Sequence, residues 1–286
     1  MNNALSFDIE EYFHAEVFSG VVRREEWSAL ESRVARTTEL LLELLDEAAT
    51  AATFFVLGWV AERQRGLIRR IAEGGHELAC HGYGHQMITR LSRSEFASDV
   101  ERAKGLIEET AGVGVVGYRA PTFSVVRETL WSLDVLADQG FQYDSSIFPI
   151  VHDRYGIPDA PRFPHRRTTP SGAEMAEFPM STVARGRWRI PVAGGGYFRL
   201  FPYAVTRRAL QDINTREGQP AMVYLHPWEL DAGQPRLPMG RLSRFRHSVN
   251  TRKTESRLRR LLRDFQFRPV RTVLGKVGLP LVGGVA

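Results

Sequence analysis

Two histidines four residues apart, His81 and His85, are the clearest candidates for chemistry in this chain. They follow the short apolar run 77–80, which predicts a strand that delivers both imidazoles into one loop. Neutral imidazoles bind zinc and similar divalent ions, which commonly add a carboxylate and a water. A pair of loop histidines also occurs on ordinary surfaces, so the metal interpretation depends on what the rest of the chain brings to it.

The elements that must position this pair alternate along the first half of the chain. The apolar runs that predict strands are 4–7, 52–57, 77–80, 115–118 and 141–143. Between them lie the amphipathic patterns that predict helices, at 24–48, 59–72, 92–110 and 127–139. Ser92 and Glu95 form a capping box at the start of the third helix. This alternation predicts an α/β architecture with parallel strands, either a barrel or an open sheet.

The second half is less regular. Prolines mark a long loop from 149 to about 179, and short strands are expected at 187–192 and 196–200. A helix at 204–215 and a strand at 221–225 follow, then a basic loop at 241–250 and a last helix at 255–265. We expect one domain spanning 1–286, with an irregular insertion at 149–200 and a C-terminal extension at 231–286.

Polar side chains follow five of the predicted strands. They are Asp8 and Glu10; His81 and His85; Arg119; Asp144; and His226. In a parallel barrel the functional side chains gather at the carboxyl ends of the strands, so these groups should meet in one site. The third metal ligand is then Asp8 or Glu10, and the other carboxylate is free to take a proton.

The bulk composition sets limits on partners and compartment. The 286 residues are 43% hydrophobic and 25% charged, which is typical of a globular protein. A net charge of +5 favours a solvated basic surface over a nucleic-acid or membrane face, so no nucleic-acid partner is expected. No signal peptide or transmembrane run is visible, which predicts a cytoplasmic protein, with peripheral membrane contact as the alternative. The single cysteine, Cys80, is expected to be a small buried strand residue, with a thiolate ligand or nucleophile as the alternative.

In this order the motifs resemble those of the NodB-homology polysaccharide deacetylases, carbohydrate esterase family 4. They are Ser6-Phe7-Asp8-Ile9-Glu10, His81-Gly82-Tyr83-Gly84-His85, Arg119-Ala120-Pro121, Tyr143-Asp144-Ser145-Ser146 and Tyr224-Leu225-His226-Pro227. The resemblance covers residues 4–230 and implies a distorted parallel (β/α) barrel. Segments 117–124, 143–153 and 226–230 are similar to one branch, which accompanies exopolysaccharide loci of the exosortase (PEP-CTERM) type. Residues 196–265 also resemble that branch.

The family resemblance implies a hydrolase that releases acetate from an N-acetylated polysaccharide or oligosaccharide. It also implies a divalent metal, with zinc expected and cobalt or nickel as alternatives. Ile9 stands where the family usually has a second aspartate, and Glu10 lies on the same side of the strand as Asp8. We therefore expect Glu10, His81 and His85 to bind the metal and Asp8 to act as base. In the swapped arrangement Asp8 is the ligand and Glu10 or Glu11 the base.

The resemblance also implies roles for the remaining polar groups. His226 would protonate the leaving amine, Asp144 would orient His226 and raise its pKa, and Arg119 would pair with the base. The alternatives are that His226 is a packed core histidine, that Asp144 caps the turn 144–146, and that Arg119 bridges two loops. The expected substrate contacts are Tyr118, Pro121, Trp228 and Tyr197, with core packing as the alternative for the aromatic rings, including Phe198. Two other functions stay open: a metal amidohydrolase acting on a small cyclic amide, and a non-catalytic carbohydrate-binding relative.

Overall fold

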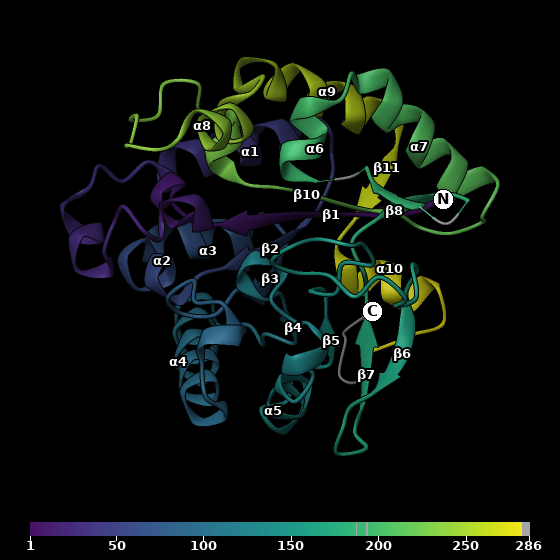
Figure 1. Cartoon of the computed structure of the whole chain (residues 1–286), viewed down its shortest axis with the longest axis horizontal. Coiled ribbons are helices and arrows are strands. Elements are labelled where there is room, and N and C mark those ends of the chain that lie inside the picture. Colours follow the sequence, from purple (N-terminus) through teal and green to yellow (C-terminus); the bar gives the residue numbers. More distant parts are fainter. Residues whose placement is uncertain (187, 193, 282–286) are drawn as a thin grey trace.

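A single curled sheet organises the protein, described here from a computed structural model that covers residues 1–186, 188–192 and 194–281. In this part of the chain the sheet has nine strands in the order β10-β1-β2-β3-β4-β5-β7-β6, with β11 beside β1 (Figure 1). They are β1 (Asn2–Ile9), β2 (Thr53–Val56), β3 (Glu77–Cys80), β4 (Gly117–Tyr118), β5 (Tyr143–Asp144), β6 (His165–Thr168), β7 (Glu174–Glu177), β10 (Met222–Leu225) and β11 (Gln266–Arg268). Only the β6–β7 pair is antiparallel within this sheet.

The described part of the chain has ten α-helices, most of which cover the outer side of the sheet (Figure 1). They are α1 (Val34–Glu47), α2 (Gly58–Arg63), α3 (Arg65–Glu73), α4 (Arg93–Ala111), α5 (Ser132–Asp138), α6 (Gly195–Leu200), α7 (Tyr203–Thr215), α8 (Arg241–Ser248), α9 (Thr254–Asp264) and α10 (Val270–Lys276). A separate antiparallel hairpin consists of β8 (Thr182–Arg185) and β9 (Trp188–Pro191). The curled, largely parallel sheet with its outer helices is a distorted (β/α) barrel, which confirms the predicted fold class.

The strand register brings the predicted strand ends to one edge. Ile9, Val56, Cys80, Tyr118 and Asp144 lie side by side on β1 to β5. Because these strands are parallel, the residues that follow each of them emerge at the same end of the barrel. The strands themselves are buried on both faces, which explains their continuous apolar sequences.

The opposite, amino-terminal end of the barrel is closed by α10. The backbone N–H of Val270 donates to the hydroxyl of Thr53, the first residue of β2, at 2.7 Å. The backbone N–H of Arg271 donates to the Glu77 carboxylate at 3.1 Å, at the start of β3. Inside the barrel the apolar side of α10 packs on a buried cluster that includes Phe55 and Tyr143. Only the carboxyl end of the barrel is therefore left for a site.

The helix expected at 24–48 is two elements, which corrects that prediction. Residues 24–29 form a 3₁₀ turn, and α1 begins only at Val34. The reason is Glu11, whose carboxylate accepts hydrogen bonds from the backbone N–H groups of Arg33 (2.9 Å) and Val34 (3.1 Å). A carboxylate that binds these free N–H groups fixes the first turn of the helix there. The pattern at 59–72 is likewise divided, into α2 and α3, at Gln64.

Three predictions in the second half are wrong. The long loop expected from 149 to about 179 contains strands β6 and β7, which belong to the main sheet. The expected strand at 196–200 is helix α6, because the chain turns sharply over the ring of Tyr224: a Cβ at Gly194 would lie 1.6 Å from that ring. Gly195 then adopts a positive φ of 38°, which favours glycine. The expected basic loop at 241–250 contains helix α8. Strand β9 lies where 187–192 was predicted, although residue 187 is outside the described part of the chain.

The capping box predicted at the start of α4 is confirmed and gives a first testable expectation. The hydroxyl of Ser92 accepts the backbone N–H of Glu95, and Glu95 accepts the backbone N–H of Ser92. Replacing Ser92 with alanine should lower the free energy of unfolding by about 1 kcal/mol, because it leaves N–H groups of the first turn unpaired. Urea unfolding measures this. Ser94→Ala, two residues on, is the control and should change stability by less than half as much.

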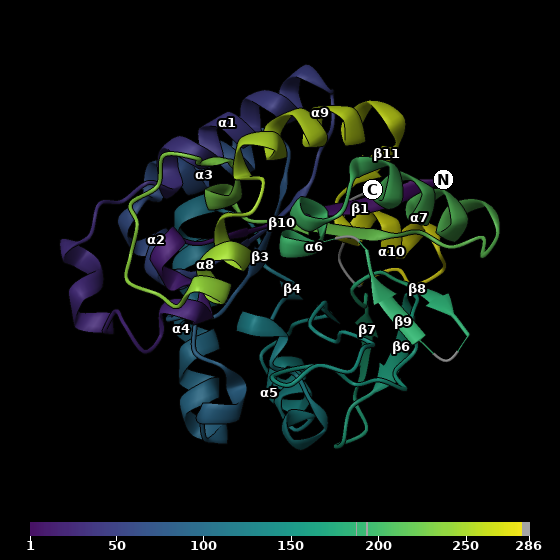
Figure 2. The same ribbon diagram turned by 45° about the horizontal axis from the view of Figure 1, so that its top comes forward.

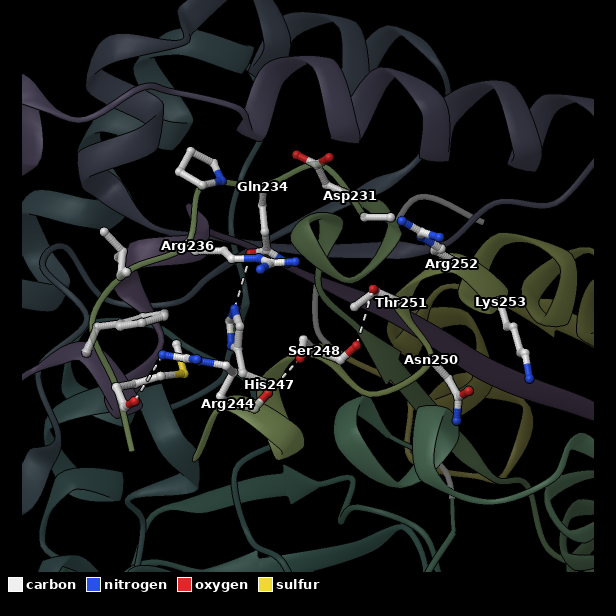
Figure 3. Close-up of a pocket in the computed structure, with 15 residues that line it drawn as sticks. Asp231, Gln234, Arg236, Arg244, His247, Ser248, Asn250, Thr251, Arg252 and Lys253 are labelled. Atoms are coloured by element: carbon white, nitrogen blue, oxygen red, sulfur yellow. Dashed lines mark hydrogen bonds between the residues drawn. The ribbon is translucent and has the colours of Figure 1, made fainter. Parts of the chain in front are cut away.

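Residues after β10 wrap back towards the carboxyl end of the barrel. Figures 1 and 2 place α8 on the side to which β1 points. Between α8 and the segments that flank it lies a cavity of about 470 Å³ (Figure 3). Among the described residues, no helix is long and apolar enough to cross a membrane.

Candidate metal and catalytic centre

Three predicted metal ligands converge at the carboxyl end of the barrel. Each of Glu10, His81 and His85 offers a ligand atom, and these atoms all lie within 4.8 Å of one another. Glu10 and His81 follow directly after β1 and β3, the two strands on either side of β2, and His85 comes from the same loop as His81. That loop is sharply bent, with φ of 72° at Gly82 and 50° at His85, and a positive φ at histidine is uncommon. The structure groups Glu10, rather than Asp8, with the two histidines.

The donor set fits a divalent cation. Nδ1 of His81 donates to the backbone carbonyl of Arg119 at 2.8 Å, so its Nε2 lone pair is free for a metal. Burial lowers the pKa of His81 to about 4, which keeps this imidazole neutral. The Oε2 atom of Glu10 is buried without a hydrogen-bond donor of suitable geometry, although it lies 2.8 Å from Nε2 of His85. Burial alone would raise the pKa of Glu10, but His85 outweighs it and the carboxyl pKa is lowered.

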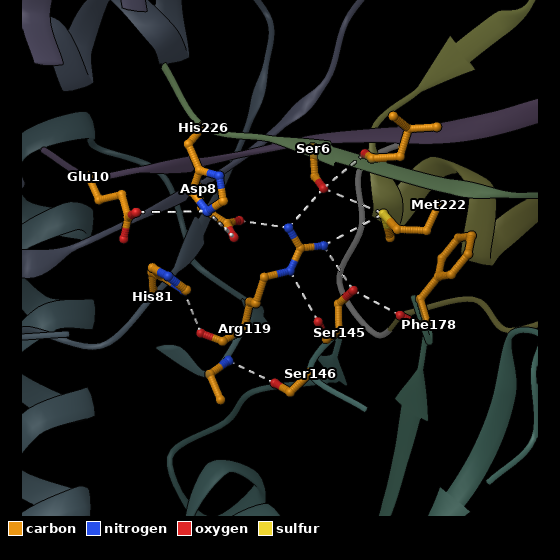
Figure 4. Close-up of polar contacts among 12 residues, drawn as sticks. Ser6, Asp8, Glu10, His81, Arg119, Ser145, Ser146, Phe178, Met222 and His226 are labelled. Atoms are coloured by element: carbon orange, nitrogen blue, oxygen red, sulfur yellow. Dashed lines mark hydrogen bonds and ion pairs between the residues drawn. The ribbon is translucent and has the colours of Figure 1, made fainter. Parts of the chain in front are cut away.

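Asp8 is held by a buried ion pair with Arg119. Its Oδ1 accepts from Nη1 of Arg119 at 2.6 Å, and neither side chain is more than 3% exposed (Figure 4). The same guanidinium donates to the Ser6 hydroxyl at 2.9 Å and to the Ser145 carbonyl at 3.1 Å. Its position is therefore fixed from several strands at once. The second oxygen of Asp8, Oδ2, is left to face the site, 3.8 Å from Nε2 of His226.

His226 is oriented by Glu229, not by Asp144 as expected. Its Nδ1 donates to Oε1 of Glu229 at 2.8 Å, while the other oxygen of Glu229 accepts from Nε of Arg199 at 2.5 Å. Nε2 of His226 lies 3.7 Å from Glu10. Burial lowers the pKa of His226, but the hydrogen bond and charge of Glu229, with the nearby carboxylates, outweigh it and raise the pKa to about 9. His226 is therefore protonated at neutral pH.

Asp144 serves another purpose. Its carboxylate accepts from the hydroxyl of Ser146 at 2.5 Å, and that hydroxyl accepts the backbone N–H of Ala120 at 2.7 Å. Asp144 also interacts with Glu177, and burial together with the charge of Asp144 raises the pKa of Glu177 well above its usual range. Burial likewise raises the pKa of Asp144. These contacts fix the loop that follows β4 and do not reach His226, because the short β5 ends with Asp144 inside the barrel wall.

The cavity above these residues has a volume of about 180 Å³. Its walls are Asp8, Glu10, Ala15, Glu16, His81, His85, Ala120, Thr122, Phe123, Tyr155, His226 and Trp228. Of the expected substrate contacts, only Trp228 lines it, and its indole Nε1 donates to Glu10 at 3.0 Å. Tyr118 is 1% exposed and packs edge-on against Phe96 and Phe141, so it is a core residue.

The other expected contacts also lie elsewhere. Pro121 is buried beneath the cavity wall, Tyr197 packs near Phe201, and Phe198 is buried in the core. The aromatic wall is instead Phe123 and Tyr155, whose ring centroids are 5.8 Å apart. Phe123 reaches the cavity through a backbone with positive φ. No sequence pattern identifies such a turn.

The sequence missed three groups around this centre. Glu229 could have been found, because it stands three residues after His226 in a short turn. No local sequence pattern identified Arg199 as part of the site. His14 is buried beside the centre, with its ring centroid 6.4 Å from that of His85 and its Nε2 without a partner in the described part of the chain. Cys80 is a buried strand residue as expected, and burial raises its thiol pKa, so it is unsuited to bind the metal.

Comparison with known proteins agrees with this centre. Residues 30–143 match the family described as "Polysaccharide deacetylase", and residues 145–275 match a "Domain of unknown function (DUF3473)". A bifunctional xylanase/deacetylase of Pseudobutyrivibrio xylanivorans is 31% identical over 109 residues, covering 38% of this chain and 18% of that protein. A peptidoglycan-N-acetylglucosamine deacetylase of Bacillus cereus is 25% identical over 120 residues, covering 38% of this chain and 44% of that protein. This chain therefore matches less than half the length of either relative.

A solved structure extends the likeness to the whole fold. A Mycobacterium smegmatis protein, whose description names a polysaccharide deacetylase, superposes with a TM-score of 0.63 at 20% identity, covering 99% of this chain and 92% of that one. Residues 30–143 thus resemble the polysaccharide deacetylase family in sequence, and the whole chain shares the fold of this solved structure. The matched family segment includes His81, His85 and Arg119, whereas Asp8, Glu10, His226 and Glu229 lie outside it.

Proposed function

We propose that this protein is a metal-dependent hydrolase that removes N-acetyl groups from the amino sugars of a polysaccharide. The observation that carries the proposal is one cavity in which Glu10, His81 and His85 converge, with Asp8 and His226 beside them. Two histidines and a carboxylate are a donor set that zinc accepts, and cobalt or nickel also accept it. We propose zinc as the ion and Glu10 as the carboxylate ligand.

The protein groups around the cavity support a hydrolytic mechanism. A divalent cation at Glu10, His81 and His85 would polarise the acetamide carbonyl and make a water molecule more acidic. Asp8, oriented by its hydrogen bond from Arg119, accepts a proton from the attacking water. His226, protonated at neutral pH, donates a proton to the departing nitrogen, which would otherwise be a very poor leaving group.

The proposed substrate is an exopolysaccharide. This part rests on the similarity of residues 117–124, 143–153 and 196–265 to the exosortase-associated branch of the deacetylases. The aromatic wall of Phe123 and Tyr155 supports a sugar substrate, because aromatic rings pack well against the apolar faces of sugar rings.

Acetate release from N-acetylhexosamine oligomers tests the proposal. The metal-loaded protein should release acetate, and removal of the metal with a chelator should reduce the rate at least 100-fold, because polarisation of the carbonyl is then lost. Adding zinc back should restore the rate. Full activity in protein shown by elemental analysis to be metal-free would contradict the metal-dependent mechanism, and no release from any N-acetylated glycan would contradict the function.

A further inference from the structure

The positive charge of this protein is concentrated at its C-terminal end. Residues 231–286 contain thirteen of the 38 lysines and arginines but only three of the 33 acidic residues. The net charge of the whole chain is +5, so the rest of the chain is acidic overall. This basic segment includes α8, which the fold brings to the same end of the barrel as the candidate metal centre.

Four of these cations line the 470 Å³ cavity, which we call the basic cavity (Figure 3). They are Arg236, Arg244, Arg252 and Lys253. None of the four forms an ion pair with a described residue. Asp231 is the one acidic residue among those that line the cavity, and it is already neutralised by Arg33 at 2.5 Å and Arg36 at 3.2 Å. The cavity therefore presents uncompensated positive charge to a ligand.

One aromatic stack separates the basic cavity from the metal centre. His247, which lines the basic cavity, stacks on Trp228 with centroids 4.5 Å apart and planes at 16°. Trp228 lines the other cavity and donates to Glu10. Burial lowers the pKa of His247 to about 4, so the ring is neutral. Its Nε2 donates a hydrogen bond to Oε1 of Gln234 at 3.1 Å, which fixes the orientation of the ring. A polymer that passes over this stack would reach both cavities.

The basic cavity is anchored to the catalytic groups through Arg199. This buried guanidinium binds Glu229, which orients His226, and it also donates to the carbonyls of His247 at 2.9 Å and Val249 at 3.0 Å. Those carbonyls lie at the end of α8, where helical carbonyls lack internal partners. One side chain thus fixes both α8 and the turn that carries His226, so the two cavities have a defined relative position.

We propose that the basic cavity binds a carboxylate-bearing sugar of the same glycan whose neighbouring residue is deacetylated. The inference rests on the proposed function and deepens it: the substrate is an anionic polymer that contains acidic sugars as well as N-acetylated ones. Guanidinium groups pair with carboxylates through two parallel hydrogen bonds, and an arginine-lined cavity provides several such donors. A glycan is favoured over a membrane surface, because the cations line a concave cavity that adjoins a sugar-sized site.

A matched pair of ligands and variants tests the basic cavity. The ligands are oligosaccharides of alternating N-acetylhexosamine and hexuronic acid, and the same oligosaccharides with each carboxylate converted to a methyl ester. The double variant Arg236→Gln with Arg252→Gln should raise KM and Kd for the acidic form about tenfold, leave kcat unchanged, and leave the ester unaffected. Arg69→Gln with Arg166→Gln, two exposed arginines on α3 and β6, is the charge-matched control and should change neither.

Direct titration of binding separates this inference from the proposed function. Charge-dependent binding of the acidic oligosaccharide without acetate release would reject the deacetylase reaction but support the basic cavity as an acidic-sugar site. Equal affinity for the acidic and ester forms, or equal loss of both in the double variant, would overturn the inference. Binding to phosphatidylglycerol vesicles that the double variant loses, with oligosaccharide binding unchanged, would overturn it in favour of a membrane surface.

Discussion

Replacing Asp8, near the end of β1, and Glu10, directly after it, one at a time should separate metal binding from proton transfer. Glu10→Gln should lose its metal, because the amide replaces the charged oxygen that lies beside His81 and His85. Asp8→Asn should keep stoichiometric metal but lose about 10²- to 10⁴-fold in kcat, the usual contribution of a general base. Elemental analysis after gel filtration and acetate release are the two measurements.

Folding must be checked in the same experiment, because Asp8 forms a buried ion pair with Arg119. Removing one member of such a pair typically costs about 3–5 kcal/mol. In Asp8→Asn the Ser6 and Ser145 contacts of Arg119 remain, so we expect a less stable but folded protein. Loss of metal from Asp8→Asn together with full metal in Glu10→Gln would show that the two roles are reversed.

Replacing Glu229 with glutamine should move the pH dependence of the reaction. Glu229 is the main group that raises the pKa of His226 to about 9, against the effect of burial. The acid form of His226 is therefore present below about pH 9 and lost above it, so the wild-type rate should fall on the alkaline side near that pH. If the pKa returns to its ordinary value near 6.5, only about 3% of His226 is protonated at pH 8, and kcat there should fall about thirtyfold.

The matched control is Asp144→Asn, which changes the residue first expected to orient His226. Its carboxylate contacts Ser146 and Glu177 instead, so the alkaline limit of the rate should stay where it is in the wild type. The pH–rate profile and the NMR titration of His226 measure the effect independently of any loss of stability. An unchanged pH–rate profile in Glu229→Gln, with a shifted profile in Asp144→Asn, would show that Asp144 rather than Glu229 controls the pKa of His226.

The sequence alone determined the parts of this protein that depend on short-range patterns. Alternating apolar runs and amphipathic helices predicted an α/β architecture with parallel strands, either a barrel or an open sheet, because buried strands and one-sided helices have different periods. The capping box at Ser92 was visible because its two members, Ser92 and Glu95, lie only three residues apart. The order of the strand-end motifs pointed to one centre with His81, His85 and either Asp8 or Glu10, since parallel strands bring their carboxyl ends together.

Tertiary structure decided which distant side chains meet. Glu11 sets the start of α1 from over twenty residues away, and Gly194 turns the chain where the ring of Tyr224 leaves no room for a Cβ. Tyr118 was predicted to contact the substrate but is buried in the core. An aromatic side chain suits a core and a binding cavity equally, so its type does not distinguish the two. These outcomes depend on contacts between elements, which no local pattern records.

The hydrogen-bond partner of His226 shows most clearly which assignments required the tertiary structure. Asp144 and Glu229 are both carboxylates near a strand end, and only the packed structure distinguishes them: the first is bound within the barrel wall, while the second lies between His226 and Arg199. Arg199 in turn is fixed by α8, in a segment that the sequence pattern described as a loop. The sequence predicted that a metal site and an acid–base pair lie at this end of the barrel. Long-range hydrogen bonds among buried charges determined which residues orient them, because each buried charge must find its partner wherever the fold provides one.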